Sequence, residues 1–395
     1  MMKNILNFIK EKLTGKATKE DDRNIIERLD EEAREAADPT KREKLEVKVV
    51  ELKETSKVLE SKTETAAPKK KAFGLDIGTS RIVSLKRDAA GNDVSQEQLN
   101  AFITVPDSEF VKEMLDKNEM DYTKIKDDFA VLGYDAQKFA NIFNSEIRRP
   151  MRTGLLKPDE FNAIPVIKEI IKLIIPRAES MGQNMCFSIP APQVGFESDL
   201  IFHEGILKKY LVGMGYKAKS ITEGTAVVLS ELSGDNYTGV GISMGAGMCN
   251  VCFSFLAVPV IVFSIPKGGD DIDTAVSRVT NETVNRVRGI KEESLDFSQT
   301  PKNNMENAFH IYYEDLIMSL LNHLSAVFSQ AENLPKLTQA IPIVLAGGTC
   351  LPNGFKVKFD KILRQVKLPI EISEVRTAIN LVRATANGAM VNASV

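Results

Sequence analysis

Three short stretches rich in glycine and small polar residues have the composition of a phosphate-binding site. They are residues 73–80 (FGLDIGTS), 239–248 (GVGISMGAGM) and 345–352 (LAGGTCLP). In the first two, the glycines follow an apolar, β-prone run, as in the turn of a hairpin. Such turns direct main-chain N–H groups at an anion, because no Cβ blocks its approach. Two hairpins this far apart in sequence indicate two lobes that close on one phosphate chain.

The segments around these turns alternate between strand-like and helix-like patterns. We expect strands at 73–75, 82–85, 185–189 and 341–346, a further apolar run at 101–105, and a strand pair at 239–251 and 253–263. We expect helices at 108–115, 134–142, 158–174, 197–212, 271–288, 305–330 and 378–391. This alternation, with a phosphate turn near the start of each half, predicts a two-lobed α/β fold.

The composition of the chain changes near residue 72. Residues 17–72 are dense in Lys and Glu and poor in apolar residues, which predicts a solvated helix with a flexible tether. Residues 1–16 instead predict a short cationic amphipathic helix. That helix could lie on an anionic membrane, or it could pack on its own domain or on a neighbouring subunit. Its apolar positions are Met2, Ile5, Leu6, Ile9 and Leu13.

Bulk composition excludes several classes of protein. The chain has 395 residues, of which 43% are apolar, enough for two domains and an extension. Its net charge of −3 provides no basic field, so we expect no nucleic-acid partner. Its four cysteines favour a reducing cytoplasm, and Cys249 and Cys252 would lie on opposite faces of a strand as buried thiols. The three histidines share no metal-ligand spacing. We find no run of bilayer length and no cleavable signal pattern.

In unbroken order from residue 73 to 395, these turns and four further stretches resemble the actin-like ATPase superfamily, and within it MreB-like bacterial actins. The resemblance implies an actin-like fold of duplicated ribonuclease H-like lobes, with a charged extension at 1–72, lobe I at 73–238, and lobe II at 239–395 ending in a connecting helix. The further stretches are 147–154 (IRRPMRTG), 221–226 (ITEGTA, bearing the catalytic glutamate), 268–273 (GGDDID) and 384–389, in the second connecting helix.

The resemblance implies ATP and Mg²⁺ as ligands. Asp76 would face Mg²⁺ through water, and Glu223 would orient the water that attacks the γ-phosphate. A helix N-terminal carboxylate is the alternative interpretation of Glu223. The implied phosphate-binding residues are Gly78, Thr79, Ser80, Gly245, Ala246 and Gly247. Those implied for the nucleoside are Gly347, Gly348 and Thr349 beneath it, with Glu282 near the ribose and Arg286 and Arg288 near the base. An exposed amphipathic helix would explain the last three residues nearly as well.

Two departures from the family pattern bear on activity. The second hairpin normally opens with an aspartate, and here that position is Ser243. A serine can hydrogen-bond a metal-bound water, but it carries no charge to hold the metal or polarise the water. We therefore expect slow or absent hydrolysis with nucleotide binding retained. The outer subdomain of lobe II, between Arg288 and Met305, is also shorter than in MreB-like proteins.

The function implied by the resemblance is a cytoplasmic, nucleotide-dependent filament protein, held at the inner membrane face if residues 1–16 bind lipid. Filaments would need only a head-to-tail interface, and polymerisation would multiply weak membrane binding by avidity. The alternatives are a non-polymerising nucleotide-switch scaffold, a chaperone-like ATPase, and a small-molecule kinase, for which no base is evident. Cell shape, organelle positioning and DNA segregation all use this fold, and the sequence selects neither among them nor between ATP and GTP.

Overall fold

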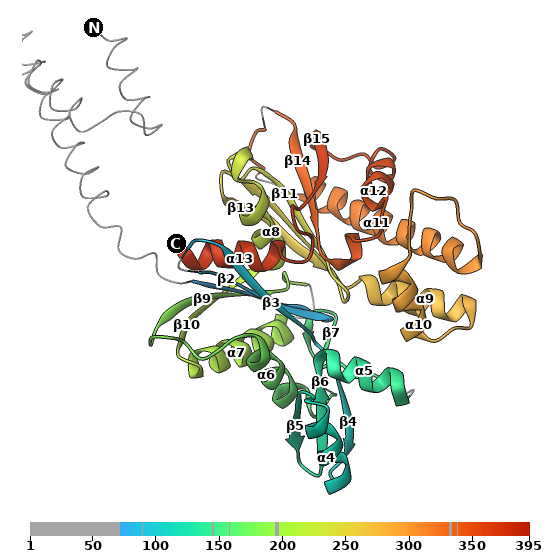
Figure 1. Ribbon diagram of the computed structural model, residues 1–395. Coiled ribbons are helices and arrows are strands. Elements are labelled where there is room, and N and C mark those ends of the chain that lie inside the picture. The colour runs from blue at the N-terminus through green and yellow to red at the C-terminus, as the bar shows by residue number, and fades with distance from the viewer. Residues whose placement is uncertain are drawn as a thin grey trace, which may run out of the picture. The chain divides into compact units, whose positions relative to one another are not determined.

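Two five-stranded sheets with the same strand order form the frame of residues 70–395 (Figure 1). In each sheet, an antiparallel meander of three strands is extended by two strands that run parallel to its first strand. Sheet I has the order β10-β9-β1-β2-β3, from Tyr216–Thr222, Gln183–Ile189, Phe73–Ile77, Arg81–Arg87 and Asp93–Leu99. Sheet II, read in the corresponding direction, has the order β15-β14-β11-β12-β13, from Ile372–Thr377, Ile341–Ala346, Gly239–Met244, Cys249–Phe255 and Val258–Ile265. The repeated topology confirms the predicted two-lobed, duplicated α/β fold.

The computed structural model describes residues 72–395 except positions 89, 144–145, 158, 194–196, 332–333 and 338. The predicted extension at residues 1–72, with its amphipathic helix at 1–16, therefore lies outside the described residues apart from Ala72. Within the described part of the chain, every helix is too short or too polar to cross a bilayer.

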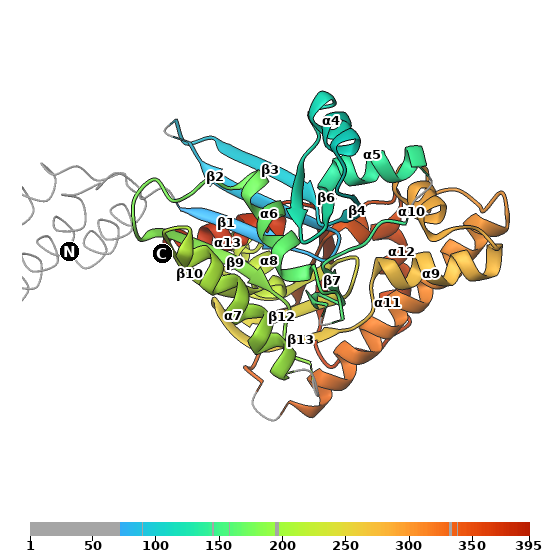
Figure 2. The same cartoon turned by 90° about the horizontal axis from the view of Figure 1, so that it is seen from below.

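Lobe I carries an inserted subdomain with its own small core. A three-stranded antiparallel sheet of order β4-β6-β5 packs against two helices. Helix α4 begins after Ser108, whose side-chain oxygen accepts a hydrogen bond from Val111 N at 3.2 Å. The short β7–β8 hairpin then leads to α6 and later to α7, which lie against sheet I (Figure 2). The bounds are β4 Phe102–Pro106, α4 Glu109–Lys117, β5 Tyr122–Ile125, β6 Asp128–Leu132, α5 Gly133–Phe143, β7 Met151–Arg152, β8 Leu155–Leu156, α6 Ala163–Ile174 and α7 Glu197–Gly213.

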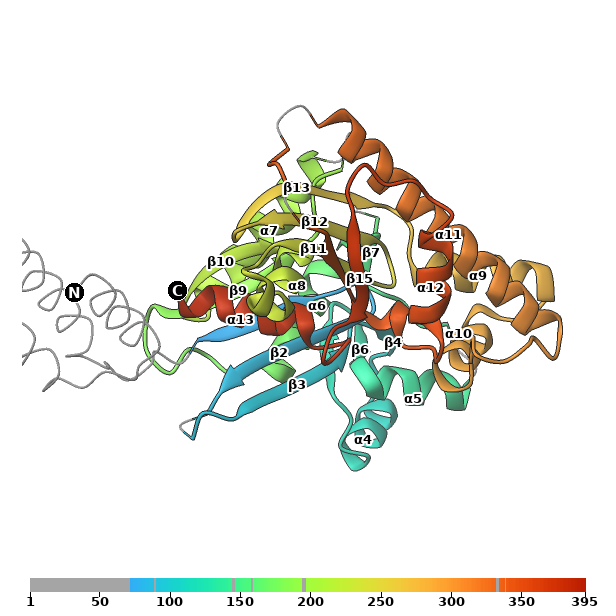
Figure 3. The ribbon, with the colours of Figure 1, turned by 90° about the horizontal axis from the view of Figure 1, so that it is seen from above.

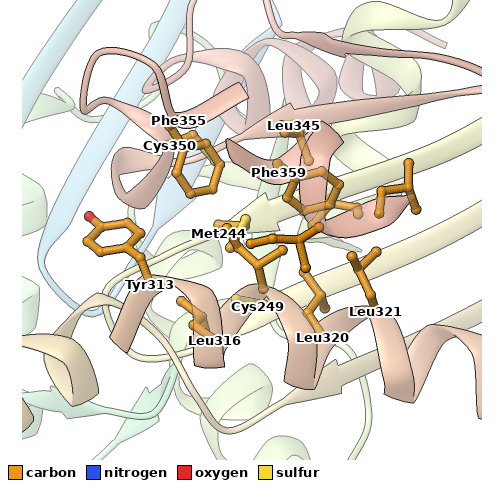
Figure 4. Close-up of a cluster of buried hydrophobic side chains, with 14 of the residues drawn as sticks. Met244, Cys249, Tyr313, Leu316, Leu320, Leu321, Leu345, Cys350, Phe355 and Phe359 are labelled. Atoms are coloured by element: carbon orange, nitrogen blue, oxygen red, sulfur yellow. The ribbon is translucent and has the colours of Figure 1, made fainter. Parts of the chain in front are cut away.

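Lobe II is built around α11, the longest described helix. Its apolar face packs on sheet II and on α12, where Leu316, Leu320 and Leu321 meet Met244 and Phe359 (Figure 4). Between α9 and α11, the described chain forms the helix α10 and an isolated bridge from Asp296 to Asn353, whereas the inserted subdomain of lobe I has a sheet. The bounds are α9 Gly269–Thr280, α10 Val284–Glu293, α11 Asn304–Gln330 and α12 Phe355–Leu363.

Two helices, α8 (Glu223–Glu231) and α13 (Ala384–Ser394), lie side by side between the sheets (Figure 3). Helix α8 follows sheet I but packs on sheet II, while α13 follows sheet II and packs on sheet I. Their backbones approach closely because Gly388 has no side chain: a Cβ there would lie 1.8 Å from the Ala226 carbonyl oxygen. This contact joins the two lobes through their backbones.

Several expected elements differ from the observed ones for local reasons. The expected strand pair at 239–263 is three strands, because turns at 245–248 and 256–257 divide it. The expected helix at 271–288 is two, since Asn281 takes a left-handed conformation (φ +57°) and ends α9. The expected helix at 158–174 begins only at Ala163. The one at 378–391 begins at Ala384, after the unpredicted strand β15. The expected helices at 108–115, 134–142, 197–212 and 305–330 are confirmed within two residues.

Candidate functional site

A cavity of about 300 Å³ lies where the two lobes meet, and both glycine-rich hairpins line it. Its volume is in the range of small-molecule sites. The structure brings twelve of the predicted site residues to its wall: Asp76, Gly78, Thr79, Ser80, Glu223, Ser243, Gly245, Ala246, Gly247, Gly347, Gly348 and Thr349. The predicted nucleoside contacts Glu282 and Arg286 do not line it.

The two hairpin turns face one another across this cavity. The first is closed by a hydrogen bond from Gly78 N to the Arg81 carbonyl (3.0 Å), and the second by one from Gly245 N to the Met248 carbonyl (2.9 Å). A Cβ on Gly247 would lie only 2.6 Å from Thr79 Oγ1. Turns from opposite lobes, more than 160 positions apart in the chain, therefore converge on one point.

The carbonyl and amide groups of the turns differ in their hydrogen-bond partners. On the second turn, the Gly245 carbonyl accepts from Gly269 N (3.0 Å) and from Thr349 Oγ1 (2.8 Å), and the Ala246 carbonyl accepts from Asp270 N (2.8 Å). These bonds fix the turn from the α9 side. Within the described residues, the N–H groups of Ala246 and Gly247, like those of Thr79 and Ser80, donate to no main-chain acceptor. These amides are therefore the donors left for an anion.

Two carboxyl groups share the floor of the cavity. Asp76 is the last residue but one of β1, and its Oδ1 accepts a hydrogen bond of 2.6 Å from Ser188 Oγ, which itself accepts from Ile77 N. Glu223 begins α8, and its Oε2 accepts a hydrogen bond of 2.8 Å from Ser243 Oγ. Burial raises the pKa of Asp76 from 3.8 to about 6. Burial, together with the nearby charge of Asp76, raises the pKa of Glu223 from 4.5 to about 8.

This arrangement suits a hydrated cation better than a metal bound directly by the protein. No group of three or more His, Cys, Asp and Glu side chains within the described ranges is arranged to hold a metal. Mg²⁺ keeps several waters and binds mainly to nucleotide phosphates, so two carboxylates facing one hollow are enough. A cation there would also favour the ionised forms that burial now disfavours.

The part of the cavity wall expected to hold the nucleoside includes residues that were not predicted. Gly347 has φ +98°, and a Cβ there would lie 2.3 Å from the Met244 carbonyl oxygen, so only glycine fits. Helix α10 contributes Lys291 and Glu292 to the wall, neither of which was predicted. Glu282 and Arg286 instead pair with each other on the surface at 3.1 Å. Further lining residues that the sequence analysis missed include Gly154, Gly269, Leu381 and Val382.

An interruption of the chain before α10 bears on where Glu282 and Arg286 lie. The sequence analysis expected one continuous helix over 271–288, which would include both residues. The left-handed residue Asn281 instead ends α9, and Thr283 caps α10, its Oγ1 accepting from Arg286 N. Asn as a helix end and Thr as a helix start are both recognisable signals in the sequence.

Comparisons with known proteins agree with this fold. The Volactin family model matches residues 71–393. A MamK double helical filament structure aligns with 82% of this chain and 98% of its own, at 17% identity and a TM-score of 0.61. MreB 5 of Spiroplasma citri, bound to AMPPNP, aligns with 80% of this chain and 94% of its own, at 13% identity and a TM-score of 0.55. Among curated proteins, none matches in sequence. The chain therefore belongs to the Volactin family and has a bacterial actin-like fold.

Proposed function

We propose that this protein binds ATP with Mg²⁺ between lobe I (residues 73–238) and lobe II (residues 239–395) and assembles into filaments when it does so. One observation carries the proposal: the turn at Gly247 approaches the turn at Thr79 so closely that a Cβ would leave 2.6 Å to Thr79 Oγ1. Main-chain donors from both lobes then serve a single phosphate chain, which bridges the lobes and favours the closed state.

The residues of the site would act in distinct ways. The amides of the two turns would bind the phosphates, and Asp76 would hold the hydrated cation beside them. Bound Mg²⁺ supplies positive charge that offsets the negative charge of the phosphates. Glu223 can orient a water as an acceptor only after losing its proton, and its pKa of about 8 means that most of it is protonated at neutral pH without ligand. Ser243 adds no negative charge to the site, so hydrolysis should be slow.

Filament formation is proposed from the fold. The fold neighbours include a MamK double helical filament. A head-to-tail interface between copies of this chain would produce an open polymer, and the nucleotide would fix the lobe arrangement that such an interface needs. Residues 1–16 would attach the polymer to an anionic membrane, giving a cytoplasmic protein at the inner membrane face.

The test is electron microscopy and pelleting of the full chain with and without ATP and Mg²⁺. We expect filaments only with nucleotide. The variant Gly247→Ala should form none, because its new Cβ would collide with Thr79. Gly289→Ala is the matched control, since a Cβ at that position meets nothing within 4 Å. Filaments of Gly247→Ala equal to those of the parent would contradict the site, and nucleotide-independent filaments of the parent would contradict the switch.

A non-polymerising nucleotide-switch scaffold is the second candidate, favoured by the buried Ser243 and its bond to Glu223. It predicts nucleotide binding without pelleting. Membrane attachment is tested separately by co-sedimentation with anionic liposomes. Deleting residues 1–16 should abolish it, and unchanged binding would exclude this helix as the anchor.

A further inference from the structure

The Arg149 guanidinium contacts groups that belong to both lobes. Its Nη2 donates to Ser80 Oγ at 3.1 Å, on the first phosphate turn. Its Nη1 donates to both carboxylate oxygens of Asp270, each at 2.8 Å, at the start of α9 in lobe II. The side chains of Arg149 and Asp270 are only 15% and 31% exposed, so solvent screens their attraction little. One side chain therefore spans the cleft beside the cavity.

Asp270 is also part of the second phosphate turn through its backbone. Its N–H donates to the Ala246 carbonyl at 2.8 Å, and the preceding Gly269 N binds the Gly245 carbonyl. The carboxylate that Arg149 holds thus belongs to the residue that fixes the second turn. The chain Ser80, Arg149, Asp270, Ala246 links the first turn to the second through hydrogen bonds alone.

The ion pairs around this link carry a small excess of positive charge. Asp270 and the fully buried Asp273 face three cations, because Arg288 approaches both carboxylates (3.4 and 3.3 Å) and Lys291 lies 2.7 Å from Asp273. Burial would raise the pKa of Asp270, but Arg149 and Arg288 outweigh it and keep that pKa below its ordinary value. Three cations against two carboxylates leave one net positive charge, and Lys291 also lines the cavity.

We infer that Arg149 is a positioning residue: it holds the two phosphate turns at nucleotide-binding distance, and its pair with Asp270 must separate before nucleotide can leave. The statement about nucleotide release rests on the proposed function. The statement about the distance between the two turns applies with or without a ligand.

Arginine suits this position better than lysine. Its planar fork donates to two acceptors in different directions, here a hydroxyl on one lobe and a carboxylate on the other. A lysine keeps the charge but concentrates it on one nitrogen at the end of a flexible stem. Arg149→Lys therefore removes the span while preserving the net charge of the network.

The width of the cleft can be measured without nucleotide by pulsed electron paramagnetic resonance. All four native cysteines are buried, so labels attach selectively to new ones. Phe110→Cys in α4 and Val279→Cys in α9 suit this purpose, because these side chains are 77% and 60% exposed and lie on different lobes (Figure 1). We expect one narrow distance in the parent and a longer, broader distribution in both Arg149→Lys and Asp270→Asn.

Arg148→Lys is the matched control. Arg148 pairs with Glu160 at 2.5 Å entirely within lobe I, so its variant should keep the parent's inter-lobe distance. Nucleotide dissociation, followed with a fluorescent ATP analogue and Mg²⁺, should be faster by about tenfold or more in Arg149→Lys and Asp270→Asn, and the double variant should add little to either.

The outcomes separate the two proposals. A parent that binds no nucleotide refutes the proposed function, while the ligand-free distances still test Arg149. Distances in Arg149→Lys and Asp270→Asn identical to those of the parent overturn the inference, as does an altered distance in Arg148→Lys alone. If Arg149→Lys does not fold, Asp270→Asn provides the same comparison from the other side of the cleft.

Discussion

Replacing Gly388 by alanine tests the contact between α8 and α13 on which the closed arrangement of the lobes depends. A Cβ at this position would lie 1.8 Å from the Ala226 carbonyl oxygen and 2.4 Å from its carbonyl carbon. A carbon–oxygen contact needs about 3.3 Å, so α13 would have to move by about 1.5 Å. The obstructing atoms are backbone and cannot rotate away.

Movement of α13 away from α8 is blocked on its other side. A Cβ on Gly74, in β1, would lie 2.0 Å from the Ala386 carbonyl oxygen, which shows that α13 already touches the backbone of sheet I. The helix is therefore confined from both directions. Helix propensity alone predicts that Gly388→Ala stabilises the protein by about 0.8–1 kcal/mol. Overpacking costs about 1–3 kcal/mol, and this site belongs at the upper end. We expect a net loss of about 2 kcal/mol in the free energy of unfolding.

Equilibrium unfolding in guanidinium chloride, followed by circular dichroism, measures this loss as a lower transition midpoint. Gly205→Ala in α7 and Gly289→Ala in α10 are matched controls, because a Cβ at either position meets nothing within 4 Å. Both should be as stable as the parent or more so. If Gly388→Ala matches these controls, α13 does not lie against α8 as described, and the reasoning about the closed lobes fails.

Three further predictions concern the charges of the site. Because the pKa of Glu223 is raised from 4.5 to about 8, the folded protein keeps a proton that the unfolded chain releases, so stability should fall as pH rises between about 5 and 8. Thermal melts at pH 5.5 and 8.5 should show a smaller drop for Glu223→Gln than for the parent, and equal drops would contradict the assignment. Ser243→Asp should speed phosphate release from ATP with Mg²⁺ while lowering the melting temperature of the ligand-free protein; an unchanged release rate would show that Ser243 does not limit hydrolysis. Lys291→Met should cost about 3 kcal/mol by leaving the buried Asp273 with one fewer partner, and adding Asp273→Asn should recover part of that loss in the same unfolding assay.

The phosphate turns were predictable because their chemistry is local. Glycine and small residues after an apolar strand specify a tight turn with exposed amides wherever the strand goes. One cavity is lined by Asp76, Thr79, Gly247 and Gly347. The resemblance predicted this grouping, because it supplied a tertiary arrangement that the spacing of residues alone cannot provide. The fold class was predictable for the same two reasons.

The features that could not be predicted from the sequence depend on contacts between segments far apart in the chain. Strand β10 alternates buried and exposed residues and was missed, since its one partner in sheet I, β9, is separated from it in sequence by helix α7. The pair between Arg149 and Asp270 joins residues 121 positions apart. A charged residue in one motif gives no sign of which carboxylate it will meet, so the cross-cleft network could only be seen in three dimensions.

The serine at position 243 changes the electrostatic balance of the site before a nucleotide binds. An aspartate there would add a third carboxylate beside Asp76 and Glu223, whose pKa values burial already raises. Ser243 instead donates a hydrogen bond to Glu223 and needs no counter-ion. The ligand-free cavity therefore depends less on a cation for its stability, and the Arg149–Asp270 pair can hold the lobes together in its absence. The serine at position 243 would thus both slow hydrolysis and stabilise the protein without a bound metal. Ser243→Asp should therefore raise the hydrolysis rate and lower the stability of the ligand-free protein together.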